Sequence, residues 1–144
     1  SGTLAATTKD DLLKQFEVNS VGPFLVTRAF IPHLKAAVAK HGSAYVAQIS
    51  SVMGSIGLNF GGYYGYRESK AAVNMINSSL AIDLKNDKIG AFVLHPGWVQ
   101  TDMNKGEGEI TVETSVNGLV SAIDKFTLED TGKFYDYTGK ILPW

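Results

Sequence analysis

Apolar residues recur at helical spacing in two long segments of the chain. After residues 63–70, the apolar positions are Val73, Ile76, Leu80 and Leu84. Residues three or four apart share one face of a helix, so this pattern predicts a helix with one buried side that ends near residue 86. A second such helix is expected from residue 111 to about residue 126, and its apolar face carries Val112, Val116, Leu119 and Ile123.

The first forty residues predict a helix that is broken once. Residues 7–11 combine hydroxyl side chains with acids, which is typical of a helix start. Gly22 and Pro23 are expected to interrupt this helix, with Pro23 as the first residue of a renewed helix that reaches about residue 40. Pro32 predicts a kink in the second part. Asn19 lies just before the expected break, where an amide is typical of a local cap or of a buried, hydrogen-bonded group.

Two short and mostly apolar runs, residues 44–49 and 89–94, predict buried strands of a parallel sheet. Residues 132–135 predict a short last strand. Strands that alternate with helices indicate an α/β fold with right-handed crossovers. Ligands of such sheets bind beyond the carboxyl ends of the strands, and Ser51 and Pro96 fall at those ends.

Size and composition fit one soluble globular domain. The chain has 144 residues, of which 44% are hydrophobic and 19% are charged. Its net charge of −1 gives no general attraction to nucleic acids or anionic membranes, so neither is expected as a partner. Cysteine is absent, which excludes disulfides and thiolate chemistry. The first ten residues show no signal peptide, and no apolar run is long enough to span a membrane, so we expect a cytoplasmic protein.

The histidines do not predict a metal site. His33, His41 and His95 lack the spacing that is typical of metal ligands, and no carboxylate cluster accompanies them. We interpret His95, which directly follows the second predicted strand, as strand-end structure.

Tyr66 and Lys70 are the strongest candidates for chemistry. They are four residues apart at the start of a predicted helix, so their side chains share one face. A phenol is a weak acid with a reference pKa of about 10, and a neighbouring ammonium favours the phenolate and makes the phenol a usable proton donor and acceptor. Tyr63 and Arg67 have the same spacing, but a guanidinium that is always charged is less suited to a proton relay. The alternative is a pair that only decorates the surface.

Four features occur in one order within residues 10–102: Asn19, the Ile-Ser-Ser end of the first strand with Ser51, the Tyr66-x-x-x-Lys70 pair, and the run Pro96-Gly97-Trp98-Val99-Gln100-Thr101. This series resembles the short-chain dehydrogenase/reductase family. The local sequences around Tyr66 and Pro96, together with residues 132–144, are most similar to the branch of carbonyl reductases that contains C-factor and sniffer. The resemblance implies a Rossmann-like, three-layer α/β/α fold with a parallel sheet.

The resemblance also implies a reaction in which hydride passes between a nicotinamide cofactor, NADP or NAD, and the carbonyl carbon of a small carbonyl or alcohol substrate. It makes Tyr66 the acid/base and Lys70 the residue that lowers the pKa of the phenol and binds the nicotinamide ribose. It places Ser51 on the substrate oxygen and Asn19 on a water of the proton relay. Besides Tyr66 and Lys70, the positions that would contact the cofactor are Pro96, Gly97, Val99 and Thr101.

The chain departs from the family in one large respect. Family members begin with a strand and a glycine-rich turn that cradles the cofactor's pyrophosphate, and nothing here matches it; Gly61 and Gly62 instead lie between the catalytic candidates. We therefore expect residues 1–144 to be a single domain, the C-terminal portion of a Rossmann domain whose N-terminal half is absent. Such a portion would expose the edge of its first strand and bind the cofactor weakly or not at all.

Three functions stay open on this basis. An oxidoreductase is favoured because Asn19, Ser51, Tyr66 and Lys70 occur together, and a binding module needs no such set. The alternatives are a non-enzymatic signalling or binding protein that keeps the fold, and an inactive fragment that lacks the cofactor phosphate site. By resemblance, the macromolecular partner would be a second copy of the chain, in a homodimer formed through the two long helices.

Overall fold

The computed structural model describes residues 2–144 and contains one parallel sheet with the strand order β1-β2-β3. β1 comprises Ala44–Ile49, β2 comprises Ile89–His95 and β3 comprises Phe134–Asp136. β2 lies in the middle and pairs in parallel with both neighbours. The two longer strands begin where the sequence predicts, and the third begins two residues later than expected.

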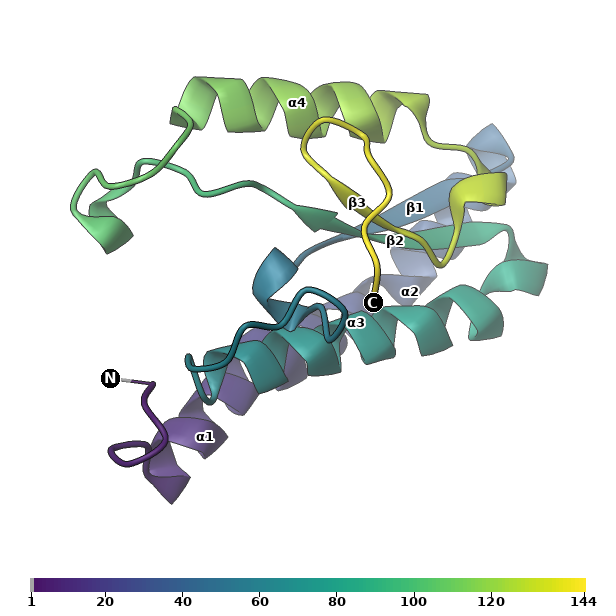
Figure 1. The fold of residues 1–144 in the computed structure, drawn as a ribbon. Helices are drawn as coiled ribbons and strands as arrows, with labels where there is room; N and C mark the ends of the chain where they lie inside the picture. Colours follow the sequence, from purple (N-terminus) through teal and green to yellow (C-terminus); the bar gives the residue numbers. More distant parts are fainter. Residues whose placement is uncertain (1) are drawn as a thin grey trace.

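Within residues 2–144, the α-helices are α1 (Lys9–Phe16), α2 (Gly22–His41), α3 (Tyr66–Asp83) and α4 (Val112–Lys125). α4 covers one face of the sheet, whereas α2 and α3 lie against the other (Figure 1). The protein therefore has the three layers, helix, sheet and helix, that the family resemblance implies. None of the helices in this part of the chain combines the length and the apolar character that are needed to cross a membrane.

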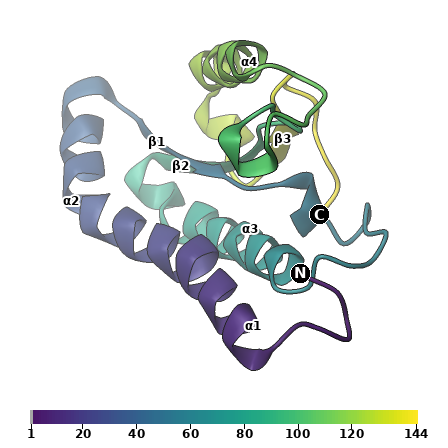
Figure 2. The same ribbon diagram turned by 90° about the vertical axis from the view of Figure 1, so that its left-hand side faces the viewer.

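The expected break at Gly22 and Pro23 is wrong. Residues Glu17–Val21 form a π-helical turn that joins α1 to α2, so that the two helices form one continuous rod (Figure 2). The N–H of Gly22 donates to the carbonyl of Glu17, five residues earlier. This wider turn accommodates the position where Pro23 has no N–H to donate, and the helix continues. Pro32 lies inside α2 without ending it.

β2 is buried on both faces and forms the centre of the core. Ile89 and Ala91 pack with residues of α2 and α3, whereas Phe92 and Leu94 pack with residues of α4 and β3. All four side chains are at most 1% exposed. Successive strand residues point to opposite faces, which explains why this strand is almost wholly apolar. Burial of a Leu, Ile or Phe side chain contributes about 1.5–3 kcal/mol, so β2 holds both helical layers together.

β1 forms an open edge of the sheet. Within the described residues its backbone pairs only with β2. Ile49, the last residue of β1, is 48% exposed. This arrangement matches the exposed strand edge that the sequence analysis expected of a partial fold.

Candidate active site

Ser51 follows β1 and caps a short turn that packs against α3. Its side chain is 6% exposed and accepts a hydrogen bond from the N–H of Met53 at 3.1 Å, at the start of the 3₁₀ turn Val52–Gly54. Gly54 fits closely onto α3, because a Cβ atom there would lie 2.7 Å from the backbone carbonyl carbon of Lys70. The turn after β1 is therefore fixed against the part of α3 that carries Lys70.

Tyr66 and Lys70 occupy the first turns of α3. The Lys70 ammonium lies 5.7 Å from the centre of the Tyr66 ring and donates a hydrogen bond to the carbonyl of Ile49 at 3.3 Å. Burial lowers the pKa of Lys70, because the charged form loses hydration. The cation therefore lies beside the phenol ring and at the carboxyl end of β1, where its acceptor Ile49 is two residues before Ser51.

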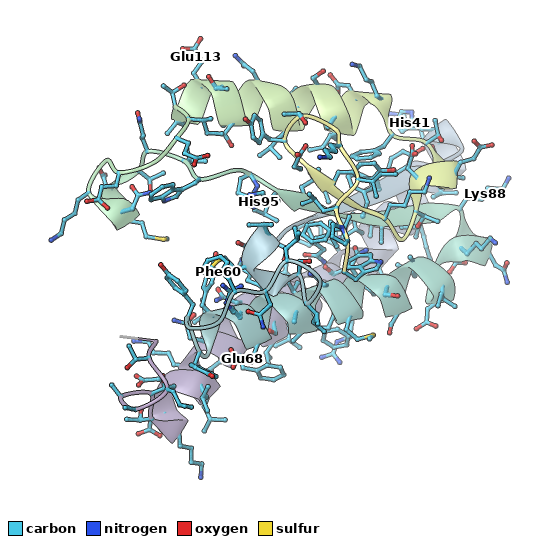
Figure 3. All side chains as sticks on the ribbon, viewed as in Figure 1. His41, Phe60, Glu68, Lys88, His95 and Glu113 are labelled. Carbon is cyan, nitrogen blue, oxygen red and sulfur yellow. The ribbon has the colours of Figure 1, made fainter. Side chains whose placement is uncertain are left out.

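Arg67 organises the loop that leads into α3. It is 8% exposed, and its guanidinium donates hydrogen bonds to the carbonyls of Met53, Gly61 and Gly62. The Phe60 ring lies 4.4 Å from the guanidinium carbon, and Figure 3 shows this side chain beside the start of α3. In the Tyr63–Arg67 pair, the guanidinium thus donates its hydrogen bonds to three backbone carbonyls. It therefore has a structural role in the loop.

Asn19 lies in the π-helical turn and binds to α3. Its side-chain amide donates to Gln15 Oε1 at 2.9 Å and to Ser69 Oγ at 3.0 Å. Ser69 Oγ in turn donates to the carbonyl of Tyr66 at 2.8 Å. The structure therefore connects Asn19 to the helical turn that contains Tyr66 and Lys70. The position of a relay water stays a prediction.

The segment 96–101 leaves the carboxyl end of β2. Ser115 Oγ on α4 donates to the carbonyl of Pro96 at 2.6 Å, and Val99 forms a bridge with Ile110 that folds the chain back. The N–H of Thr101 donates to Asn104 Oδ1 at 3.0 Å. In Figure 1 this segment, the Val52–Gly54 turn and the start of α3 all lie beyond the same end of the sheet, as the carboxyl-end rule predicts.

His95 joins the end of β2 to the Ser51 turn, a contact that no pattern in the sequence indicates. Its Nδ1 accepts a hydrogen bond from the N–H of Val52 at 3.0 Å. Burial lowers the pKa of His95, and the negative charge of Asp136 opposes this effect in part. The description of His95 as strand-end structure was thus incomplete, because the side chain also reaches the turn that follows β1.

A hollow of about 500 Å³ lies between α1 and the start of α3. Its lining residues are Gly2, Asp11, Lys14, Gln15, Val18, Tyr63, Tyr64 and Tyr66. Tyr66 is the only predicted site residue among them in the described part of the chain. The side of Tyr66 that faces α1 is therefore open to a small molecule.

Gly97, a predicted cofactor contact, has a conformation that few other residues tolerate. Its φ is +88°, and a Cβ atom would lie 2.6 Å from Ile110 Cδ1 and 3.0 Å from the Tyr137 ring. Gly42 has nearly the same φ, +87°, with no neighbour within 4 Å, and is therefore a matched control. We expect Gly97→Ala to lower the free energy of unfolding by about 1–3 kcal/mol more than Gly42→Ala does, because crowding adds to backbone strain. Urea unfolding measures both, and equal losses would contradict the close packing around Gly97.

Comparison with families of known proteins gives a consistent result. A profile described as short chain dehydrogenase matches residues 1–111. C-signal of Myxococcus xanthus is 40% identical over 135 residues, which cover 93% of this chain and 79% of that protein. The 1-hydroxy-2-glutathionyl-2-methyl-3-butene dehydrogenase of Rhodococcus sp. (strain AD45) is 39% identical over 140 residues, 94% of this chain and 59% of that enzyme.

Solved structures share the fold. The carbonyl reductase Sniffer of D. melanogaster has a TM-score of 0.94 at 35% identity, and the match covers 98% of this chain and 60% of that one. An NADPH-bound carbonyl reductase from chicken fatty liver has a TM-score of 0.90 at 33% identity, with 99% and 60% covered. The expected Rossmann-like fold is thereby confirmed. This chain spans about 60% of the length of these reductases.

Proposed function

Because this chain belongs to the short-chain dehydrogenase family, we propose that it carries the proton-transfer centre of an NAD(P)-dependent oxidoreductase. The reaction would reduce a small carbonyl compound or, in reverse, oxidise an alcohol. Tyr66 would be the acid/base, with Lys70, Ser51 and Asn19 in supporting roles. The family relationship supports oxidoreduction in general, and these residue roles are the specific part of the proposal.

One observation supports the proposal most strongly. The partly buried Lys70 ammonium lies beside the Tyr66 ring and is bound to the last carbonyl of β1. A cation with little hydration stabilises a neighbouring phenolate more strongly than an exposed one does, because fewer waters screen its charge. A phenol that can give up and regain its proton in this way is a suitable acid for the oxygen of a carbonyl group.

The residues in this region fit a nicotinamide nucleotide. A lysine ammonium has three N–H donors, and within residues 2–144 the Ile49 carbonyl is its only acceptor, so two donors are left for the hydroxyls of a ribose. Pro96, Gly97, Val99 and Thr101 would contact the nicotinamide side of the cofactor. A bound reduced nicotinamide would supply the hydride for the new C–H bond.

The chain's own residues would handle the oxygen and its proton. Ser51 Oγ accepts one hydrogen bond from Met53, and its own O–H is free to donate to the substrate oxygen. Tyr66 would transfer its phenolic proton to that oxygen as the C=O bond becomes a C–O–H group. Asn19, bound to Ser69 on α3, would hold the water through which Tyr66 is reprotonated.

A cofactor-consumption assay tests this function. The absorbance of NADPH or NADH is followed with a panel of aldehydes and ketones, at rising cofactor concentrations. None of the strands in residues 2–144 leads through a short glycine-rich turn into a helix that could bind the cofactor's phosphates, so we expect a rate that does not saturate easily. Cofactor oxidation that does not depend on any carbonyl compound would refute the proposal.

A signalling or binding role is the second candidate. The similarity to C-signal, which covers 79% of that protein, favours it. A binding protein does not need an acid/base, so substitution of Tyr66 by Phe would leave such a function unchanged. The same substitution would remove a reductase activity, and the two candidates are thereby separated.

We further propose a homodimer that forms through the two long helices. Apolar side chains on α2 and α3 are exposed, among them Phe30 at 55%, Met75 at 68% and Ile82 at 74%. Met75 and Ile82 are seven residues apart and therefore share one face of α3. Light scattering should give twice the mass of the chain, and a monomer at all concentrations would contradict the dimer.

A further inference from the structure

The end of β2 and the turn after β1 are connected by one side chain. His95 is the last residue of β2, and Figure 3 shows its side chain between that strand end and the Val52–Gly54 turn. Nδ1 of His95 accepts the N–H of Val52 at 3.0 Å, across 43 positions of sequence. Val52 directly follows Ser51, which the proposed function places on the substrate oxygen.

Two acceptors together hold the start of this turn. His95 Nδ1 binds the N–H of Val52, and Ser51 Oγ binds the N–H of Met53. These are two of the backbone donors that a helical turn leaves free at its beginning. The direction of the Ser51 side chain therefore depends on both hydrogen bonds. Loss of the bond between Val52 and His95 would let the backbone next to Ser51 move.

The bond to Val52 exists only while the imidazole is neutral. A neutral imidazole has one N–H and one acceptor nitrogen, and here Nδ1 is the acceptor, so the proton resides on Nε2. Protonation places a second N–H on Nδ1. That N–H points at the N–H of Val52, and attraction is replaced by repulsion.

We propose that His95 is a positioning residue of the reductase site: its neutral imidazole holds the Ser51 turn through the Val52 N–H, and a proton on the imidazole releases it. The effect of His95 on catalysis rests on the proposed function, whereas the hydrogen bond from Val52 to His95 is independent of it. Residues that act through another residue in this way affect the rate without contacting the substrate.

Few charges act on His95. Asp136, its neighbour in register on β3, favours the protonated imidazole, and its Oδ1 is bound by Thr138 and Lys140 N–H groups. The ammonium of Lys70 on α3 is directed to the carbonyl of Ile49. α4 contributes a hydrogen bond from the uncharged Ser115 to the carbonyl of Pro96, the residue after His95.

The pH dependence follows from the direction of the shift. Burial lowers the pKa of His95 below its ordinary value of 6.5, and this effect exceeds that of Asp136. The folded protein therefore prefers the neutral imidazole. The bond is fully present above pH 6.5 and is lost as the pH falls through the lowered pKa.

Amide NMR signals of the ¹⁵N-labelled chain test the inference directly, over about pH 5 to 8. We expect the signals of Val52 and Met53 to move together along the titration curve of His95. His95→Asn keeps an acceptor near the position of Nδ1 but cannot be protonated, so the signals of Val52 and Met53 should not shift with pH. His95→Gln moves the acceptor away, so the Val52 signal should be that of a free amide at every pH. His41→Asn, at the exposed end of α2, should leave the titration unchanged.

Kinetics tests the consequence. We expect His95→Gln to lower kcat/KM for a carbonyl substrate about tenfold, the effect of one lost hydrogen bond, and His95→Asn to be nearly as active as the wild type. The loss of rate on the acid side should disappear in His95→Asn. Equal rates for the two variants, or a Val52 signal that does not follow His95, would overturn the inference. A wild-type chain that consumes no cofactor would count against the proposed function, and the amide titration would still decide whether His95 holds the Ser51 turn.

Discussion

Replacement of Tyr66 by phenylalanine is expected to lower kcat for carbonyl reduction about 10²–10⁴-fold, the usual contribution of a positioned acid/base. The variant loses only the hydroxyl group, and no hydrogen bond of this hydroxyl to another described residue supports the fold. The rate of cofactor oxidation under saturating substrate, extrapolated to saturating cofactor, measures the effect. The melting temperature should stay close to that of the wild type, so that a lost rate can be assigned to lost chemistry.

Tyr63→Phe is the matched control for this variant. Tyr63 also precedes a cation by four residues, and it lines the same hollow as Tyr66. Its cation, Arg67, is bound to backbone carbonyls, and the Tyr63 side chain is 56% exposed. We expect its kcat to be unchanged. Equal losses in the two variants, or no loss in Tyr66→Phe, would mean that the phenol of Tyr66 is not the acid.

Replacement of Lys70 by methionine is expected to produce the second largest loss, about 10²–10³ in kcat, because a preorganised charge beside the reacting group is removed. Methionine keeps the length and the apolar stem. Burial lowers the pKa of Lys70. As the pH rises, the ammonium of the wild type should therefore lose its proton, and the rate should fall, at a lower pH than for an exposed lysine. The alkaline decline should be absent from the pH profile of the variant.

Lys85→Met is the control for the loss of one positive charge, since Lys85 is exposed in the turn after α3. Its kcat should equal that of the wild type. Lys70→Arg separates charge from shape, because a guanidinium keeps the positive charge but is broader than an ammonium. Its kcat should lie between those of Lys70→Met and the wild type. A Lys70→Met variant with normal kcat would contradict the proposal that the charge of Lys70 assists proton transfer by Tyr66.

The sheet was the most predictable part of the protein. Residues 44–49 form β1 as predicted, and β2 extends one residue beyond the predicted 89–94. β2 is buried on both faces and needs apolar residues throughout, so its boundaries are visible in the sequence. β1 was expected to be equally buried, but it lies at the edge of the sheet and Ile49 is exposed. The helix predicted from residue 111 to about 126 is α4, Val112–Lys125. Its predicted apolar face was wrong: Ser115, Leu119 and Ala122 lie toward the sheet, whereas Val112, Val116 and Ile123 are exposed.

The π-helical turn was not predictable from local rules. Gly22 and Pro23 together are typical of a helix break, and only the packing of this rod against α3 shows why the chain stays helical. Ser20 Oγ donates to the carbonyl of Ser69, and Asn19 donates to Ser69 Oγ. Contacts of this kind join residues that are about fifty positions apart, and they outweigh local preference.

The candidate site could be proposed from the sequence in its residue types but not in its connections. Tyr66 and Lys70 were proposed because they share one helix face, and the role of Ser51 came from the family resemblance, with its place at a strand end in agreement. The roles of Arg67 and His95 were missed, since their partners are backbone carbonyls in one case and a backbone N–H in the other. Every residue carries such groups, so the sequence does not mark which of them a side chain will reach.

The coupling between Tyr66 and Lys70 in kcat tests the central claim most directly. If Lys70 acts through the phenol, the double variant Tyr66→Phe/Lys70→Met should be no slower than Tyr66→Phe alone, because the charge has no phenolate left to stabilise. The kcat values of the wild type, both single variants and the double variant, each extrapolated to saturating cofactor because Lys70 would also bind the ribose, give this coupling. Losses that multiply, so that the double variant is slower by the product of the two single effects, would contradict a catalytic pair.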